Sequence, residues 1–364
     1  MKIDYSKVKR IFIVSDTHFG VRNNSTEWLE IQKDYFKNFF IPLLQREKRE
    51  GDIVLHAGDT FDSRHSLNLL VMNEGAKIMK EISEIMPLVV ILGNHDIYRR
   101  NTNEVNSVKM LDWLPNIEVF EEPAVVQMSS ERILLMPWRS SYEESSKCIA
   151  ENPADYLFCH TDVQGMKFNK FTEITEGLDA STFKDFKKVY SGHIHYAQLY
   201  KNIRLVGCPY QLTRSDAGNE KGIWLLDLES GKETYFPNNY SPVFLRYMLE
   251  GLLEKEESEI LEMFRNNFVD VLINPKWSIT FPFHAFSEDF NTYKKLDFIP
   301  RLNENEELSE EEAEEMKEKI DIISVAEKVI GLSSHPEVLK EKLLQKIQAL
   351  YILAQKEFSQ EETL

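Results

Sequence analysis

The chain has 364 residues, of which 42% are hydrophobic and 28% are charged. Such a chain can bury a sizeable core, which excludes a disordered or fibrous protein. The formal net charge is −17 at pH 7, so bulk positive charge cannot hold nucleic acid on this protein. Three widely spaced cysteines and the absence of a long apolar run predict a cytoplasmic protein without disulfides and without a membrane partner.

Short apolar runs recur between residues 11 and 226 and predict buried strands, because they are rich in Val and Ile and end in turn residues. Two longer stretches, residues 28–49 and 67–85, suit helices. This alternation predicts an α/β fold. The later runs lie closer together, so we expect a sheet that is partly mixed or antiparallel. The predicted strands are Ile11–Val14, Ile53–Leu55, Leu88–Leu92, Ile133–Met136, Tyr156–Phe158, Val189–Tyr190, Ile203–Val206 and Ile223–Leu226.

The pattern changes after residue 240, which predicts a boundary between a large domain (1–240) and a small one (241–302). In the small domain we expect a helix over Leu252–Phe264 and strands over Val269–Ile273 and Ser278–Phe283.

The C-terminal part begins with residues 303–319, which hold nine glutamates and two lysines and indicate an acidic linker. Residues 320–364 follow, with an apolar helix face from Leu339 to Phe358. This face either packs on its own domain or docks on a partner.

Five polar motifs each follow an apolar run, and the ends of such strands tend to meet in one crevice. Imidazole, carboxylate and amide donors without a thiolate suit Mn, Fe, Zn or Ni. Seven candidate ligands exceed the need of one ion, whereas two ions that share a bridging carboxylate would use them all, with Asp59 as the natural bridge. The motif residues are Asp16, His18, Asp59, Asp62, Asn94, His95, Asp96, His160, His193 and His195.

Taken singly, these motifs carry little information. An Asp-x-His pair is common by chance, and a lone histidine such as His160 is more often a hydrogen-bonded structural residue. Gly-Asn-His-Asp alone is compatible with a simple turn. Their joint occurrence, in this order and at predicted strand ends, favours a metal site.

Together the motifs resemble the signature of the calcineurin-like metallophosphoesterases. Residues 207–213, 222–227 and 236–239 further resemble the SbcD-type DNA double-strand-break repair nucleases, most of all the phage recombination endonuclease subunits. The resemblance implies an α/β fold in which helices flank a β-sandwich (αββα), with a small α/β capping, DNA-binding domain and C-terminal helices.

The resemblance also implies two bound metals, for which the family favours Mn²⁺ over Mg²⁺ or another divalent ion. It makes His95 the catalytic histidine and Asp62 the residue that orients it. The first metal would be held by Asp16, His18, Asp59 and His195. The second would be held by Asp59, Asn94, His160 and His193.

The expected activity is phosphodiester hydrolysis in DNA, as an exonuclease or endonuclease. Two cations would neutralise the phosphate and activate water, and His95 would protonate the leaving oxygen, helped by a carboxylate that favours its charged form. The alternatives are a phosphatase or cyclic-nucleotide phosphodiesterase on the same core, or a scaffold that has lost its metals.

The expected partners are double-stranded DNA ends and single strands. Arg64, Arg99 and Arg100 are candidates to contact the DNA backbone, although surface arginines often serve only solubility. The chain has no P-loop motif. The resemblance implies a separate SbcC-type coiled-coil ATPase that binds the C-terminal helices. It also implies a homodimer formed through helices, for which residues 28–40 and 67–85 are candidates that core packing explains equally well.

Overall fold

The computed structural model describes residues 2–99, 101–274 and 281–300, with residues 340, 342–344 and 346. The chain divides into two compact units, residues 1–304 and 305–364. Residues 340, 342–344 and 346 are helical. The acidic linker and the rest of the predicted C-terminal helices lie outside the described residues. Among the described residues, no helix has the length and hydrophobicity that a membrane span requires.

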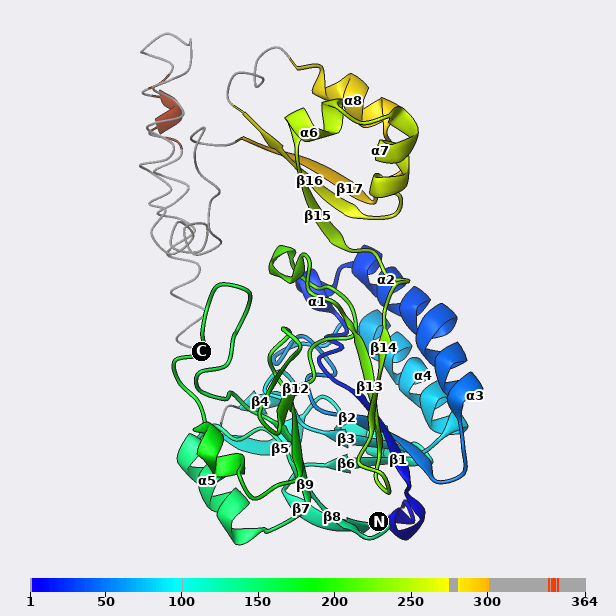
Figure 1. The fold of residues 1–364 in the computed structure, drawn as a ribbon, viewed down its shortest axis with the longest axis vertical. Helices are drawn as coiled ribbons and strands as arrows, with labels where there is room; N and C mark the ends of the chain where they lie inside the picture. The colour runs from blue at the N-terminus through cyan, green and yellow to red at the C-terminus, as the bar shows by residue number, and fades with distance from the viewer. Residues whose placement is uncertain are drawn as a thin grey trace. The chain divides into compact units, whose positions relative to one another are not determined.

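The first of two six-stranded sheets has the order β14-β13-β1-β2-β3-β6 (Figure 1). Strands β1, β2, β3 and β6 are parallel, whereas β13 and β14 run antiparallel at one edge. Every residue of β1 and β2 is buried, as expected for central parallel strands covered on both faces. The strands are β1 Arg10–Val14, β2 Asp52–His56, β3 Leu88–Ile91, β6 Ile117–Phe120, β13 Gly222–Asp227 and β14 Glu233–Pro237.

The second sheet has the order β11-β12-β10-β9-β8-β7. Its four central strands are parallel and its two edge strands are antiparallel. The prediction of a partly antiparallel sheet is therefore confirmed. The strands are β7 Ala124–Met128, β8 Glu131–Met136, β9 Tyr156–His160, β10 Lys188–Gly192, β11 Gln198–Tyr200 and β12 Ile203–Leu205.

The two sheets pack face to face, and side-chain alternation along each strand separates the layers. On β1, Ile11 and Ile13 pack between the sheets, whereas Phe12 and Val14 pack against helices. Helices α2, α3 and α4 cover the first sheet, and α5 lies on the second (Figure 1). The fold is thus the predicted mixed α/β sandwich between helices. The remaining elements of this part are α1 Val21–Asn24, α2 Thr26–Tyr35, a π-helical turn Phe36–Phe40, α3 Ile41–Glu47, α4 Leu69–Ile85, α5 Tyr142–Glu151, the hairpin strands β4 Ile97–Arg99 and β5 Thr102–Asn106, and 3-10 turns at Tyr5–Lys7, Lys109–Trp113, Ala180–Phe183 and Arg214–Asp216.

A three-stranded parallel sheet, in the order β15-β16-β17, follows with its own apolar core. The predicted helix over Leu252–Phe264 is two helices. The strand predicted over Ser278–Phe283 is wrong where it is described: Phe281 and Pro282 are not in a strand, and Phe283 begins α8. The cause is Pro282, which has no N–H for a ladder and suits the start of a helix. The elements are β15 Phe244–Met248, α6 Leu249–Leu253, α7 Glu257–Phe264, β16 Phe268–Ile273, α8 Phe283–Asp289 and β17 Lys295–Pro300.

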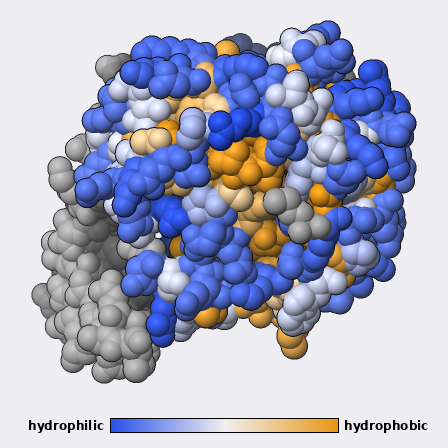
Figure 2. All heavy atoms as spheres, turned by 90° about the horizontal axis from the view of Figure 1, so that it is seen from below, coloured by the Kyte–Doolittle hydropathy of each residue, from blue (hydrophilic) through white to orange (hydrophobic). Residues whose placement is uncertain are grey.

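The surface is mostly hydrophilic, with a band of hydrophobic residues on the face that Figure 2 shows. Most single exposed apolar residues need no explanation, because polar surface cannot cover a whole protein. In the part of the chain that the structure describes, the large apolar side chains that are more than half exposed are Leu69, Val105, Trp113, Phe168 and Leu199.

Candidate metal centre

All eight side chains that the sequence predicts as metal ligands or catalytic histidine lie at the carboxyl ends of parallel strands. In the first sheet they follow the neighbouring strands β1, β2 and β3, and in the second they end or follow the neighbouring strands β9 and β10. The sandwich brings these two sets of strand ends together. The residues are Asp16 and His18 after β1, Asp59 after β2, Asn94 and His95 after β3, His160 at the end of β9, and His193 and His195 after β10.

Four of these residues have a left-handed backbone: Asp16 (φ 53°), His18 (φ 44°), Asp59 (φ 55°) and His193 (φ 82°). Non-glycine residues rarely adopt this conformation, which costs about 1–3 kcal/mol each and concentrates at functional sites. The turn at Asp16–His18 is held by the buried side chain of Gln32, whose Nε2 donates to the carbonyl oxygens of both Thr17 (2.8 Å) and His18 (3.0 Å). These hydrogen bonds thus help to hold the turn that carries Asp16 and His18 in a backbone conformation that costs free energy.

Glycines beside the ligands allow the strand ends to approach one another. A Cβ on Gly58 would lie 2.3 Å from Nδ1 of His160, and one on Gly93 would lie 2.1 Å from Oδ1 of Asp59. Both distances are shorter than real Cβ atoms show, and so is the 2.2 Å between a Cβ on Gly192 and Oγ of Ser15. The glycines in these motifs are therefore required by close packing.

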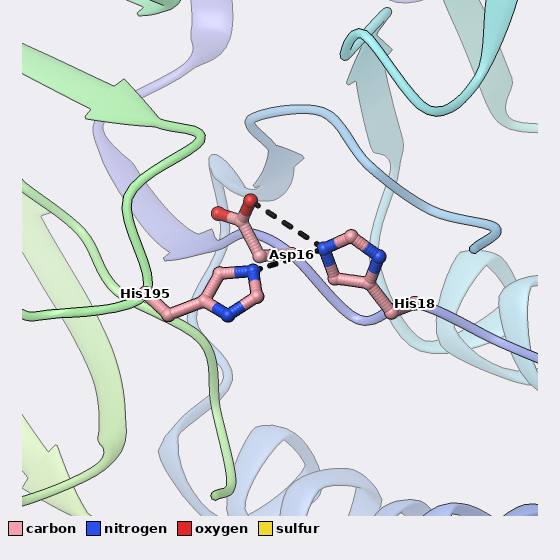
Figure 3. Close-up of side chains that lie close together, drawn as sticks. All are labelled: Asp16, His18 and His195. Carbon is pink, nitrogen blue, oxygen red and sulfur yellow. Dashed lines mark hydrogen bonds and ion pairs between the residues drawn. The ribbon is translucent and has the colours of Figure 1, made fainter. Parts of the chain in front are cut away.

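The first cluster joins Asp16, His18 and His195, whose ligand atoms all lie within 4.8 Å of one another (Figure 3). Nδ1 of His18 is 3.0 Å from Oδ1 of Asp62, so this nitrogen carries a proton and Nε2 presents a lone pair. That lone pair faces Nε2 of His195 at 3.1 Å. Two ring nitrogens in this arrangement need a proton or a cation between them.

The second cluster joins Asp59, His160 and His193, again with ligand atoms within 4.8 Å. Nδ1 of His160 donates to the carbonyl oxygen of Ala57 at 2.7 Å, so Nε2 presents a lone pair. This lone pair faces two oxygens, Oδ1 of Asn94 at 3.0 Å and Oδ2 of Asp59 at 3.3 Å. Such a contact is repulsive unless the ring gains a proton or a cation lies among the three atoms.

The buried Nδ1 of His193 has no hydrogen-bond partner, while its Nε2 lies 3.2 Å from Oδ1 of Asp162. A buried nitrogen without a partner is a free ligand atom, and a carboxylate on the opposite ring nitrogen is the usual support for a metal-binding histidine. The donor set of both clusters fits divalent cations.

Asp59 lies between the clusters. Its Oδ2 is 3.3 Å from Nε2 of His160 and 3.6 Å from Nε2 of His18, while its Oδ1 accepts a hydrogen bond from the backbone N–H of His95 at 2.8 Å. One carboxylate oxygen therefore faces both sets of donors.

The family model for calcineurin-like phosphoesterases matches residues 9–197, which include every residue of both clusters. The chain belongs to this family. It is 29% identical over 236 residues to exonuclease subunit 1 of Enterobacteria phage T4, covering 63% of this chain and 68% of the phage protein. It is 22% identical to putative phosphoesterase 244L of Invertebrate iridescent virus 6 (79% and 97% covered) and 32% identical to the DNA double-strand break repair protein Mre11 of Thermoplasma acidophilum (24% and 23%).

The histidines and carboxylates of the phosphoesterase site shift one another's pKa values in a way that favours the binding of cations. Burial by itself would lower the pKa of His18 and of His160, but the surrounding carboxylates raise both to about 9. Burial raises the pKa of Asp59, but His160 and His18 outweigh it and hold that pKa well below its ordinary value. Without metal the carboxylates thus hold protons on two rings, and a divalent cation would displace those protons.

His95 borders the clusters, and its Nδ1 donates to the backbone carbonyl oxygen of Asp62 at 2.6 Å. The family resemblance implied that Asp62 orients His95. In the structure the backbone oxygen of Asp62 makes this contact, while its side chain contacts His18. Burial lowers the pKa of His95 and outweighs Asp59, which raises it. Asp59 thus favours the charged form of His95, as expected from a neighbouring carboxylate, but burial has the larger effect on this pKa.

Sequence reasoning missed two supporting carboxylates. Asp96, named in a motif but given no role, accepts from the backbone N–H groups of Thr60, Phe61 and Gly93 and so ties the Asp59 loop to the Asn94 loop. Asp162 supports His193; it follows His160 by two residues, the spacing that drew attention to Asp16 and His18.

A third missed feature is the buried ion pair between Lys221 and Asp216. Lys221 also donates to the carbonyl oxygen of His195 at 2.7 Å and so fixes that backbone. No sequence pattern links these residues to the site, because the chain fold alone brings them there.

The predicted DNA-contact arginines differ in position. Arg64 lines a cavity of about 430 Å³ together with Asp62 and His95. Arg99 is exposed at the end of β4, and Arg100 lies outside the described residues.

Proposed function

We propose that this phosphoesterase is a metal-dependent DNA nuclease with Mn²⁺ as its metal. The observation that carries the proposal is the pair of donor clusters on either side of Asp59, in which ring nitrogens face one another or face oxygens at 3.0–3.3 Å. Two relatives support a nucleic-acid substrate, since one is named as a phage exonuclease subunit and another as a DNA break repair protein.

The proposed ligands are those that the sequence predicted. When bound, two divalent ions would supply charge neutralisation of the phosphodiester and activation of water for in-line attack. One site takes Asp16, His18, Asp59 and His195. The other takes Asp59, Asn94, His160 and His193.

His95 acts on the leaving group. Its Nδ1 is fixed by the carbonyl oxygen of Asp62, which leaves Nε2 for the substrate. The metal-free ring is mainly neutral at pH 7 because burial lowers its pKa. An anionic phosphodiester beside the ring favours its protonated form, so the substrate itself would help to charge the proton donor. Asp62 positions two rings, His18 through its carboxylate and His95 through its backbone.

The remaining proposals concern partners. Arg64, Arg99 and Arg100 would contact the DNA backbone, residues 241–302 would form a capping domain, and the chain would act as a homodimer with an SbcC-type ATPase bound through residues 320–364. Deleting 320–364 should preserve metal-dependent phosphodiester hydrolysis and abolish ATP-dependent DNA processing. A truncated chain that still binds its ATPase with full affinity would contradict this assignment.

The nuclease proposal is tested by assaying end-labelled linear DNA, bis-p-nitrophenyl phosphate and a phosphomonoester side by side with Mn²⁺. We expect cleavage of DNA and of the small diester, with little monoester hydrolysis. His95→Ser should keep its metals and lose strand scission, Asp59→Ala should lose metal as well, and His284→Ser, at an exposed histidine, should match the wild type. A preference for the monoester would favour a phosphatase instead.

A further inference from the structure

A loop between β9 and β10 carries two exposed phenylalanines beside the metal centre. The stem of this loop is anchored, because the buried side chains of Val163, Met166, Ile174 and Leu178 belong to the core under the second sheet. Backbone hydrogen bonds also pair its two arms, including those from the N–H of Gln164 to Leu178 (3.0 Å) and of Ile174 to Met166 (2.8 Å). The tip therefore stands on a rigid base.

The tip has a defined shape. The buried side chain of Asn169 accepts hydrogen bonds from the backbone N–H groups of Phe171 and Thr172, both at 2.8 Å. The backbone N–H of Phe168 donates to the carbonyl oxygen of Thr172 at 2.8 Å. With the polar residue turned inward, the two aromatic rings face solvent: Phe168 is 52% exposed and Phe171 is 48% exposed. This reverses the usual distribution of polar and apolar residues.

The position of Phe168 distinguishes it from the other exposed apolar residues, because Phe168 borders the candidate metal centre. Phe168 and Asn169 line a cavity of about 320 Å³ together with His18, His95 and His193. A ring at this place can touch a substrate whose phosphate lies at the metal centre. Phe171 follows three residues later on the same tip and adds a second exposed ring, which does not line this cavity.

Two positively charged lysines beside the rings indicate which class of ligand the tip of the loop could bind. Lys167 and Lys170 are exposed and alternate with the phenylalanines in the order Lys-Phe-Asn-Lys-Phe. The backbones of Lys167 and Glu173 form an isolated antiparallel β-bridge at the base of the tip. Cations that alternate with exposed aromatic rings suit a single nucleic-acid strand, since the rings stack on bases and the ammonium groups attract phosphates.

We propose that Phe168 and Phe171 form a stacking platform for unpaired bases of the strand whose phosphate occupies the metal centre. This inference deepens the proposed nuclease function and rests on it. It predicts that the enzyme binds a strand end with free bases better than the same backbone without bases.

The test measures equilibrium binding of the full chain to two fluorescein-labelled single strands of equal length, an oligothymidylate and an abasic oligomer. Fluorescence anisotropy in EDTA and at one fixed salt concentration keeps the strands intact and makes the result independent of metal. We expect the wild type to bind the oligothymidylate about 5- to 150-fold more tightly than the abasic strand, the range that stacking of one base supplies.

Phe168→Ala should lose most of this preference, Phe168→Trp should keep it, and Trp113→Ala, at an exposed aromatic residue that does not line the cavity, should match the wild type. Thermal melting of each variant checks that it folds. A wild type without base preference would overturn the platform, even if it cleaves DNA with Mn²⁺. A chain that hydrolyses bis-p-nitrophenyl phosphate but neither binds nor cleaves DNA would overturn the proposed function and the platform together.

Phe168→Ala and a second variant, Phe171→Ala, also test whether a protein binds this surface. If Phe168→Ala and Phe171→Ala convert a dimer into a monomer in analytical ultracentrifugation while base preference is unchanged, the rings contact a second copy of the chain and the platform is wrong.

Discussion

Gly93→Ala should disable the metal centre without removing any ligand. The new Cβ would lie 2.1 Å from Oδ1 and 2.2 Å from the backbone nitrogen of Asp59. Real Cβ atoms essentially never approach closer than 3.0 Å, so residue 93 and Asp59 must move apart by about 0.9 Å. Catalytic groups need to be held within about 0.5 Å, and a displacement near 1 Å can lower the rate about 100-fold. Overpacking should also destabilise the fold by about 1–3 kcal/mol.

The assay compares Gly93→Ala with the wild type by elemental analysis, by the Mn²⁺-dependent rate on bis-p-nitrophenyl phosphate and by urea unfolding. We expect less than the wild-type metal content and a rate about 100-fold lower in protein that is still folded. Gly251→Ala is the matched control, because its Cβ would meet no atom within 4 Å, and it should keep full activity. Wild-type metal content and rate in Gly93→Ala would refute the view that close approach of these loops places Asp59.

Three further substitutions test the supports of the fold and the site. Glu233→Gln weakens a carboxylate on β14 that accepts two hydrogen bonds from Arg204 on β12 and so joins the two sheets. Burial raises the pKa of Glu233, but Arg204 outweighs burial, so the pKa of this carboxyl group is lowered. The wild type should therefore be more stable than the variant at pH 7 and should lose this advantage as the pH falls below about 4.5. Urea unfolding at both pH values measures the difference in stability. Asp162→Ala removes the carboxylate on Nε2 of His193 and should weaken Mn²⁺ binding about 10- to 100-fold by calorimetric titration; unchanged affinity would contradict its supporting role. Asp96→Ala leaves three buried backbone N–H groups without an acceptor and should lower the free energy of unfolding by about 3 kcal/mol or more, whereas a loss under about 1 kcal/mol would show that water replaces it.

The central strands of the sandwich could be predicted because each of them has a recognisable local sequence pattern. All eight predicted strands are present, and all of them except β13 have a parallel neighbour; such buried strands are short, continuous apolar runs that need no partner to be recognised. Four strands of the two sheets, β6, β7, β11 and β14, were not predicted. The candidate metal-binding side chains at the strand ends could be placed together because the carboxyl ends of parallel strands lie at the same edge of a sheet. The ligand roles remain proposals, because the geometry shows which atoms meet and not which ion they hold.

The three-stranded sheet was harder to predict because its pattern is ambiguous. Phe281 and Phe283 alternate as in a strand, yet Phe283, Phe286 and Phe290 have helical spacing, and Pro282 decides for the helix. Short apolar stretches between such signals fit either structure until packing selects one.

Long-range supports could not be predicted at all. Lys221 reaches His195 through a contact between residues 26 positions apart, and Asp96 binds Thr60 across 36 positions. No local sequence pattern predicts such contacts, because they form only when the sheets assemble.

The central claim is that Asp59 lies between two metal ions, and anomalous diffraction from a crystal soaked in Mn²⁺ tests it directly. We expect two peaks, about 3.5–4 Å apart, with Asp59 contacting both. Absence of a peak among these side chains, or a single peak that does not touch Asp59, would contradict the account.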